Sequence, residues 1–108
     1  MNTSGFIRGL MAKNVDEETF LTHVVSSIEK QLKEWDEYYV VRLVKLTNYV
    51  VVVQNGNLII SVPISKSQLI SFQSQSPYSL DRYIWNELHR KAVMIGESNG
   101  NYLTYVFH

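Results

Sequence analysis

A run of β-branched residues interrupted by an Asn-Gly pair is the feature that most constrains how this chain can fold. Residues 48–64 read NYVVVVQNGNLIISVPI. An Asn-Gly pair between two such runs favours a β-hairpin, because both residues tolerate the positive φ that a type I′ turn requires. An Asn55-Gly56 turn predicts three residue pairs that share one apolar sheet face. These pairs are Val53 with Leu58, Val51 with Ile60 and Tyr49 with Val62.

A further strand is predicted before this hairpin. Residues 38–46 read YYVVRLVKL, a composition typical of a strand. A three-residue connection at 46–48 directs Tyr39, Val41 and Leu43 to the apolar face and Arg42 to the opposite face. A two-residue connection would instead bury Arg42, and burying an unpaired guanidinium is costly. We therefore expect the three-residue connection, or a bulge near residue 46.

The second face of the predicted sheet is also aliphatic in its middle. It carries Val40, Val44, Val50, Val52 and Ile59. These side chains are too many to be left in water without a cause. The sequence predicts that either a long helix or a second copy of the chain covers them. They are therefore the candidate self-association residues.

Two long amphipathic helices are predicted. In the first, from residue 16 to residue 35, apolar residues recur at three- and four-residue steps, and Asn14 or Asp16 can cap its start. In the second, at 79–92, Ser79 is the predicted N-cap. Its apolar stripe contains Leu80, Ile84, Leu88 and Ala92.

The remaining segments complete an α+β pattern. Residues 1–15 predict a short helix or an N-terminal arm, residues 66–73 a short helix, and residues 101–107 a last strand after an Asn99-Gly100 turn. Pro63 should end the third strand or lie at a sheet edge. The order is α-β-β-β-α-α-β, and an alternative order adds a strand at 93–98. We expect one domain over residues 1–108, with an antiparallel sheet of about four to five strands and two long helices.

Composition narrows the functional classes. Ten basic and ten acidic residues cancel, which disfavours binding of nucleic acid or anionic membranes through bulk charge. The chain has no cysteine, which excludes disulfides and thiolate metal sites and fits a reducing compartment. The longest apolar runs are strand-length, and residues 1–13 lack the apolar core of a signal peptide. We therefore expect a cytoplasmic protein that does not associate with membranes.

The sequence contains no P-loop, dinucleotide glycine fingerprint, GxSxG elbow or HExxH pair. The histidines His23, His89 and His108 are far apart, and the helical stripe places His23 on the solvent side. Acidic clusters at 16–18 and 36–37 flank a helix, where acids are common. We therefore expect no bound metal, no cofactor and no enzymatic activity.

The polar side of the helix at 79–92 is the candidate partner-binding surface. It contains Arg82, Trp85, Asn86, His89 and Arg90. Guanidinium, amide and aromatic groups together are typical of helices that read a partner or a base. An ordinary exposed face is the plainer interpretation, because Asp81 and Glu87 lie within reach of the cations. The element order of residues 66–107 also matches a winged helix, although the predicted wing has no lysine or arginine.

The sequence as a whole predicts a small non-catalytic binding or regulatory module that acts through protein-protein contacts, with a homodimer as one form. Seven tyrosines and two tryptophans suit a surface that binds another macromolecule. The alternative is a nucleic-acid-binding regulator that uses the helix at 79–92 within a winged-helix-like C-terminal half.

Overall fold

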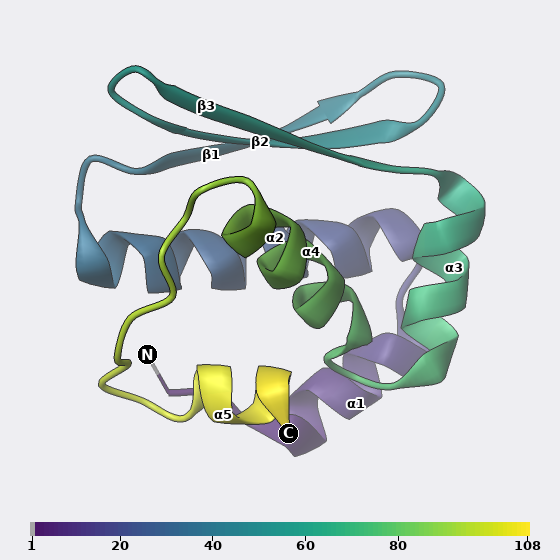
Figure 1. Ribbon diagram of the computed structural model, residues 1–108. Helices are drawn as coiled ribbons and strands as arrows, with labels where there is room; N and C mark the ends of the chain where they lie inside the picture. The colour runs from purple at the N-terminus through teal and green to yellow at the C-terminus, as the bar shows by residue number, and fades with distance from the viewer. Residues whose placement is uncertain (1) are drawn as a thin grey trace.

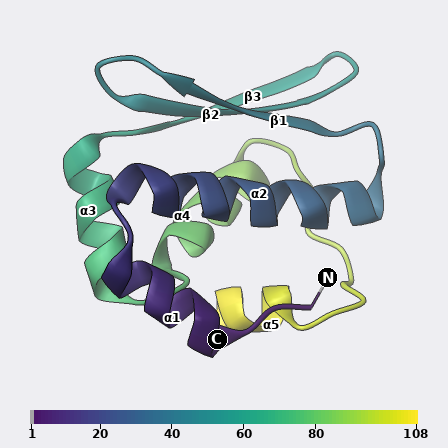
Figure 2. The same ribbon diagram turned by 180° about the vertical axis from the view of Figure 1, so that it is seen from behind.

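The computed structural model describes residues 2–108 as a β-sheet with all of the described helices on one side of it (Figures 1 and 2). This arrangement confirms the α+β class. Along the chain the elements are α1 (Gly5–Asn14), α2 (Glu17–Trp35), β1 (Val40–Lys45), β2 (Tyr49–Asn55), β3 (Leu58–Ile64), α3 (Lys66–Gln75), α4 (Ser79–Arg90) and α5 (Tyr102–Phe107). Within residues 2–108, no helix has the length and apolar character needed to cross a membrane.

The sheet has three antiparallel strands in the order β1-β2-β3, fewer than the four to five expected. Residues 93–98 form no strand, and the predicted last strand is the helix α5. Tyr102, Leu103 and Val106 are the buried residues of α5, and this spacing suits one side of a helix. The sheet lies on the other side of the molecule from α5 (Figure 1), so no strand is there to pair with. The winged-helix-like hairpin is therefore absent from the described residues.

The predicted connection between β1 and β2 is confirmed. Val41 pairs with Val53 and Leu43 with Val51, which leaves the three residues 46–48 as the connection. Arg42 points to the opposite face and is exposed. The cost of burying a guanidinium selected the correct register here.

The predicted pairing of β2 with β3 is wrong by two residues. Val53 pairs with Ile60 and Val51 with Val62, so the turn is Gly56-Asn57 and not Asn55-Gly56. Gly56 has φ of +58°, whereas Asn57 has no positive φ, the pattern of a type II′ turn with glycine first. Because side chains alternate with a period of two, a two-residue shift keeps every side chain on its predicted face.

α2 confirms the most regular of the predicted helices. Its N-cap is Asp16, whose side chain accepts a hydrogen bond from the backbone N–H of Thr19 at 2.8 Å. His23, expected on the solvent side, is instead half-buried. Desolvation lowers the pKa of His23 below its ordinary value, and the charges of Arg8 and Lys30 lower it further. The prediction failed because the side chain of Arg8, from α1, lies against this part of α2.

α1 shows that the N-terminal segment is a helix, one of the two forms expected for it. α3 begins with a capping box at Ser65 and is two residues longer than predicted.

The N-cap of α4 is Tyr78 and not Ser79 as predicted. The Ser79 hydroxyl donates to the carbonyl oxygens of residues 72 and 76, so it does not cap the helix. The helix ends at Arg90, two residues earlier than predicted, and Ala92 beyond it has φ of 107°, a value no helix contains.

The hydrophobic core lies between the inner face of the sheet and the helices. The inner face contributes Val51, Val53, Ile60, Val62 and Ile64, all buried. α2 and α4 supply most of the opposing side chains. Pro63 lies on β3, an edge strand, as its missing N–H predicts, and the strand continues one residue further.

Candidate functional site

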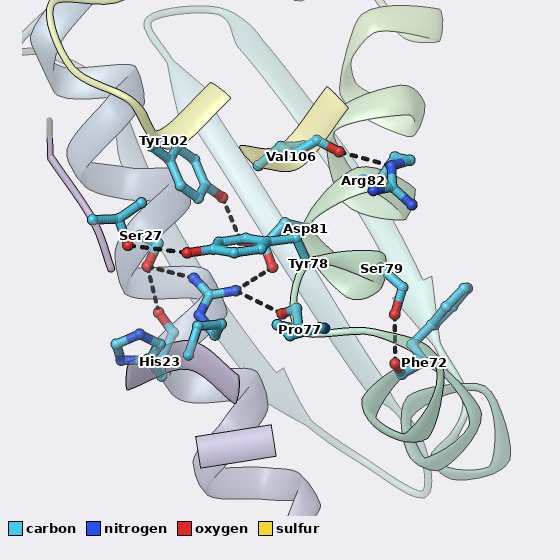
Figure 3. Close-up of polar contacts among 12 residues, drawn as sticks. His23, Ser27, Phe72, Pro77, Tyr78, Ser79, Asp81, Arg82, Tyr102 and Val106 are labelled. Atoms are coloured by element: carbon cyan, nitrogen blue, oxygen red, sulfur yellow. Dashed lines mark hydrogen bonds and ion pairs between the residues drawn. The ribbon is translucent and has the colours of Figure 1, made fainter. Parts of the chain in front are cut away.

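A buried ion pair between α1 and α4 is the most distinctive polar feature of the molecule. The guanidinium of Arg8 donates through Nη1 to Oδ1 of Asp81, and the two side chains are 1% and 0% exposed. The hydroxyl of Tyr102, on α5, donates to Oδ2 of Asp81 at 2.5 Å. Nη2 of Arg8 donates to Oγ of Ser27, on α2, at 3.0 Å. Four helices therefore meet at one polar cluster (Figure 3).

Aromatic rings surround this cluster. The guanidinium carbon of Arg8 lies 4.6 Å from the centre of the Tyr78 ring, within the range of a cation–π contact. Nε1 of Trp85 donates to the Tyr102 hydroxyl at 3.2 Å. Nη1 of Arg8 also reaches the carbonyl oxygen of Pro77, at 3.3 Å. Among the described residues only Nε of Arg8 has no acceptor in this cluster.

Burial governs the protonation of this cluster. It raises the pKa of Tyr102 well above the ordinary value of a tyrosine, and the adjacent charge of Asp81 raises it further. Tyr102 therefore remains a hydrogen-bond donor. Burial also raises the pKa of Asp81, while the Arg8 cation and the Tyr102 hydroxyl counteract that rise. A substrate cannot reach side chains this completely buried, so the cluster fixes the helices to one another.

The sequence analysis did not identify this pair, although one signal was available. Asp81 lies three residues before Ile84 and seven before Leu88, on the apolar stripe of its own helix. An acid on such a stripe requires a buried cation or a neutral form. Nothing in the sequence indicates that Arg8 supplies the cation, since the two residues are 73 positions apart.

The predicted partner-binding set on α4 is brought together only in part. Trp85 is fully buried, and its ring packs edge-on against Trp35 with the ring centres 5.6 Å apart. The prediction that Trp85 lies on the surface is wrong. The sheet, α2 and α5 all contact α4, so a wider side of this helix is buried than the apolar stripe alone predicts. Arg82 is half-buried and its Nε donates to the carbonyl oxygen of Val106 at 2.7 Å. The members that remain exposed are Asn86, His89 and Arg90.

A shallow pocket of about 250 Å³ lies between α3 and α4. Arg82 and Asn86 line it, whereas His89 and Arg90 do not. Phe72 and Tyr83 form one wall, with stacked rings 4.9 Å apart. Its volume is below the usual range of ligand sites.

A larger groove of about 510 Å³ lies between α1 and the end of α3. Lys13 is its one charged lining residue, and the others are small or uncharged polar groups. The side-chain amide of Gln73, at the wall of the groove, donates to the carbonyl oxygens of Ala12 and Val15, at 3.1 and 2.9 Å. No Asp, Glu or His in the described part of the chain lines the groove, so it offers no carboxylate or imidazole for acid–base work. Among residues 2–108 no group of His, Cys, Asp or Glu could hold a metal ion.

The outer face of the sheet carries all the candidate self-association residues. No helix covers this face in either view (Figures 1 and 2). Val40 is 47% exposed and Ile59 62% exposed, whereas Val44 and Val50 are half-buried. Val52 lies at the centre of the face, opposite Arg42 and Ser61 on the neighbouring strands, and is only 9% exposed.

No family model, curated protein or solved structure matches this chain.

Proposed function

We propose that this protein is a small non-catalytic module that binds another protein through the outer face of its sheet. The observation that carries the proposal is that the described helices all lie on the inner side of the sheet, which leaves the outer face uncovered (Figures 1 and 2). An antiparallel sheet with one solvated side usually carries polar residues there. Here the outward positions form a largely aliphatic surface, and such a surface commonly marks an interaction site.

The exposed area of each side chain limits the free energy that a partner can gain by covering it. Covering Val40 and Ile59, each about half exposed, would contribute on the order of 1 kcal/mol per side chain. Val52 is already shielded by its neighbours and would contribute less. A partner must therefore cover the whole face, since no single side chain provides enough stabilisation to offset the entropy lost on association.

The charge on this face indicates the chemistry of the partner. Arg42 is exposed beside Val52 and makes no ion pair with any residue from 2 to 108. The other outward positions of the strands are Val40, Val44, Val50, Val52, Gln54, Ile59, Ser61 and Pro63, none of them acidic. The partner should therefore present an apolar surface with a carboxylate that can face Arg42.

Affinity capture from the native host with four baits tests the proposal. The baits are the wild type, Ile59→Asp, Arg42→Glu and, as a matched control, Ile70→Asp on α3, where Ile70 is 49% exposed. We expect the wild type and the control to bind the same protein equally well, and both face variants to bind it at least tenfold more weakly. Equal binding by all four folded baits would show that the outer face is not the contact surface. Homodimerisation through this face would appear as a mass change that Ile59→Asp abolishes.

Nucleic-acid binding through α4 has less support. Trp85 is buried, Arg82 is bonded to α5, and Arg90 pairs with Glu87 at 2.7 Å. The same capture experiment examines this alternative if the nucleic-acid content of each bound fraction is measured. Bound nucleic acid that is lost with Arg90→Ala, with a steep dependence on salt, would favour the alternative over a protein partner.

A further inference from the structure

The two edges of the sheet differ in how their backbone groups are satisfied. Because Pro63 has no N–H, its pair with Val50 cannot exchange two hydrogen bonds, so Ser61 and Pro63 direct their backbone groups away from β2. Nζ of Lys91 donates to the carbonyl oxygen of Ser61 at 2.8 Å, and the Tyr83 hydroxyl donates to that of Pro63 at 3.4 Å. Proline and side chains from the α4 region therefore protect the β3 edge.

The β1 edge lacks this protection. The same alternation directs the N–H and C=O groups of Val41, Leu43 and Lys45 away from β2. The N–H of Val41 donates to Oε2 of Glu29, on α2, at 3.2 Å. Among residues 2–108, no group pairs with the outward N–H or C=O of Leu43 or Lys45. An exposed edge of this kind is a template for another strand.

We propose that the β1 strands of two copies of this chain pair antiparallel about a two-fold axis at Leu43. The two sheets then form one continuous six-stranded sheet. Leu43 exchanges both backbone hydrogen bonds with Leu43 of the second copy, and Val41 lies opposite Lys45 of that copy. Such an interface is isologous, because each copy contributes the same strand. The edge is separate from the outer face, so this pairing does not depend on a partner bound there.

The charges beside β1 are complementary in this register. Opposed residues share a sheet face, so Lys45 of the second copy lies on the helix side of the sheet next to Val41. The Val41 N–H, which Glu29 accepts in the single chain, then donates to the carbonyl oxygen of that Lys45, and the Glu29 carboxylate becomes available to its ammonium group. Lys45 pairs with Glu18 of its own chain at 3.0 Å, and both side chains are about half exposed. Because an exposed ion pair is weak, Lys45 can exchange Glu18 for Glu29 of the second copy. Arg42 lies opposite Val44 of the second copy, so the two arginines do not face each other.

A charge exchange between Glu29 and Lys45 tests the interface. In a homodimer of Glu29→Lys, the new lysine of each chain faces Lys45 of the other chain. In a homodimer of Lys45→Glu, the new carboxylate of each chain faces Glu29 of the other chain. A mixture of the two variants restores an opposite-charge pair at both positions. In sedimentation equilibrium we expect a concentration-dependent doubling of mass for the wild type and for the mixture. Each variant alone should remain monomeric at concentrations where the wild type is dimeric.

Hydrogen exchange of the Leu43 amide in the wild type provides a measurement that needs no substitution. In the monomer this N–H points to solvent and should exchange fast, whereas dimerisation should protect it increasingly as concentration rises. Ile59→Asp should leave both the mass and this protection unchanged. A wild type that stays monomeric at millimolar concentration would overturn the proposal. So would a dimer with an unprotected Leu43 amide, or one that Ile59→Asp dissociates. None of these results would affect a different protein bound at the outer face.

Discussion

Arg8 and Asp81 lie 73 residues apart in the sequence, yet their side chains form an ion pair that is almost wholly removed from solvent. Two charges taken out of water lose their hydration, and their mutual attraction offsets that loss only when the geometry and the remaining hydrogen bonds are good. Ser27 and Tyr102 supply such bonds. The pair therefore contributes most as a constraint that joins α1 to α4.

Removing one member of the pair should be much more harmful than removing both. Arg8→Met leaves a buried carboxylate without its cation and should lower the free energy of unfolding by about 3–5 kcal/mol. Arg8→Met combined with Asp81→Leu should lose less than the single variant, because no charge remains buried. Urea denaturation measures both. As a control, Lys66→Met breaks the exposed pair with Glu17 at 3.5 Å and should change stability by less than about 1 kcal/mol. A double variant less stable than Arg8→Met would contradict this account.

Tyr102 should make stability fall at high pH. Its folded pKa lies well above that of an unfolded tyrosine, first because of burial and then because of the Asp81 charge. Above pH of about 10 the unfolded chain loses this proton while the folded chain keeps it, so stability falls by up to about 1.4 kcal/mol per pH unit. Below that pH the contribution of the group is constant.

The comparison of wild type with Tyr102→Phe isolates this effect from the other tyrosines. The variant should be less stable at pH 8, because Asp81 loses a hydrogen bond, but the difference should shrink between pH 9 and 11. Denaturant midpoints across this range measure it. A difference that stays constant with pH would mean that Tyr102 ionises normally in the folded protein.

Adjacent positions on β2 should respond oppositely to the same substitution. Val51 is fully buried on the inner face, whereas Val50 is half-buried on the outer face. Val51→Asp places an unpaired carboxylate in the core and should prevent folding, while Val50→Asp should leave a folded protein. Circular dichroism during thermal unfolding distinguishes them. Cooperative unfolding of Val51→Asp near the wild-type temperature would show that the faces are assigned wrongly.

Replacing Gly56 or Gly9 by alanine should change the free energy of unfolding in opposite directions. Gly56 has φ of +58° with open space around it, so Gly56→Ala should cost about 1 kcal/mol through the backbone alone. Gly9 lies inside α1, where a Cβ would meet Cγ of Pro77 at an ordinary 3.8 Å. Gly9→Ala should therefore stabilise by about 0.5–1 kcal/mol. Chemical denaturation measures the change in the free energy of unfolding for both variants. Stabilisation by Gly56→Ala would rule out a positive φ at this position.

Local pattern was sufficient wherever a segment's own residues decide its structure. The apolar stripe of α2, the strand character of residues 40–64 and the two sheet faces were all predicted correctly, and Asp16 is one of the two caps expected for α2. Period and β-branching act within a few residues and require no knowledge of distant neighbours. The register of β1 was also predictable, because burying Arg42 would have been costly.

Tertiary packing decided what the sequence left open. Pairing shifted by two residues leaves the same side chains on each face of the sheet, so the face pattern could not distinguish the predicted turn from Gly56-Asn57. A short apolar run such as residues 102–107 fits either a strand or a helix, and it became α5 because it packs on α4 far from any strand. The burial of Asp81 and Trp85, and the choice of Arg8 as the matching cation, depend on which helices surround α4. The sequence contains these side chains, but only the packing of α1, α2 and α5 around α4 brings them together, because that proximity joins segments as far as 73 residues apart.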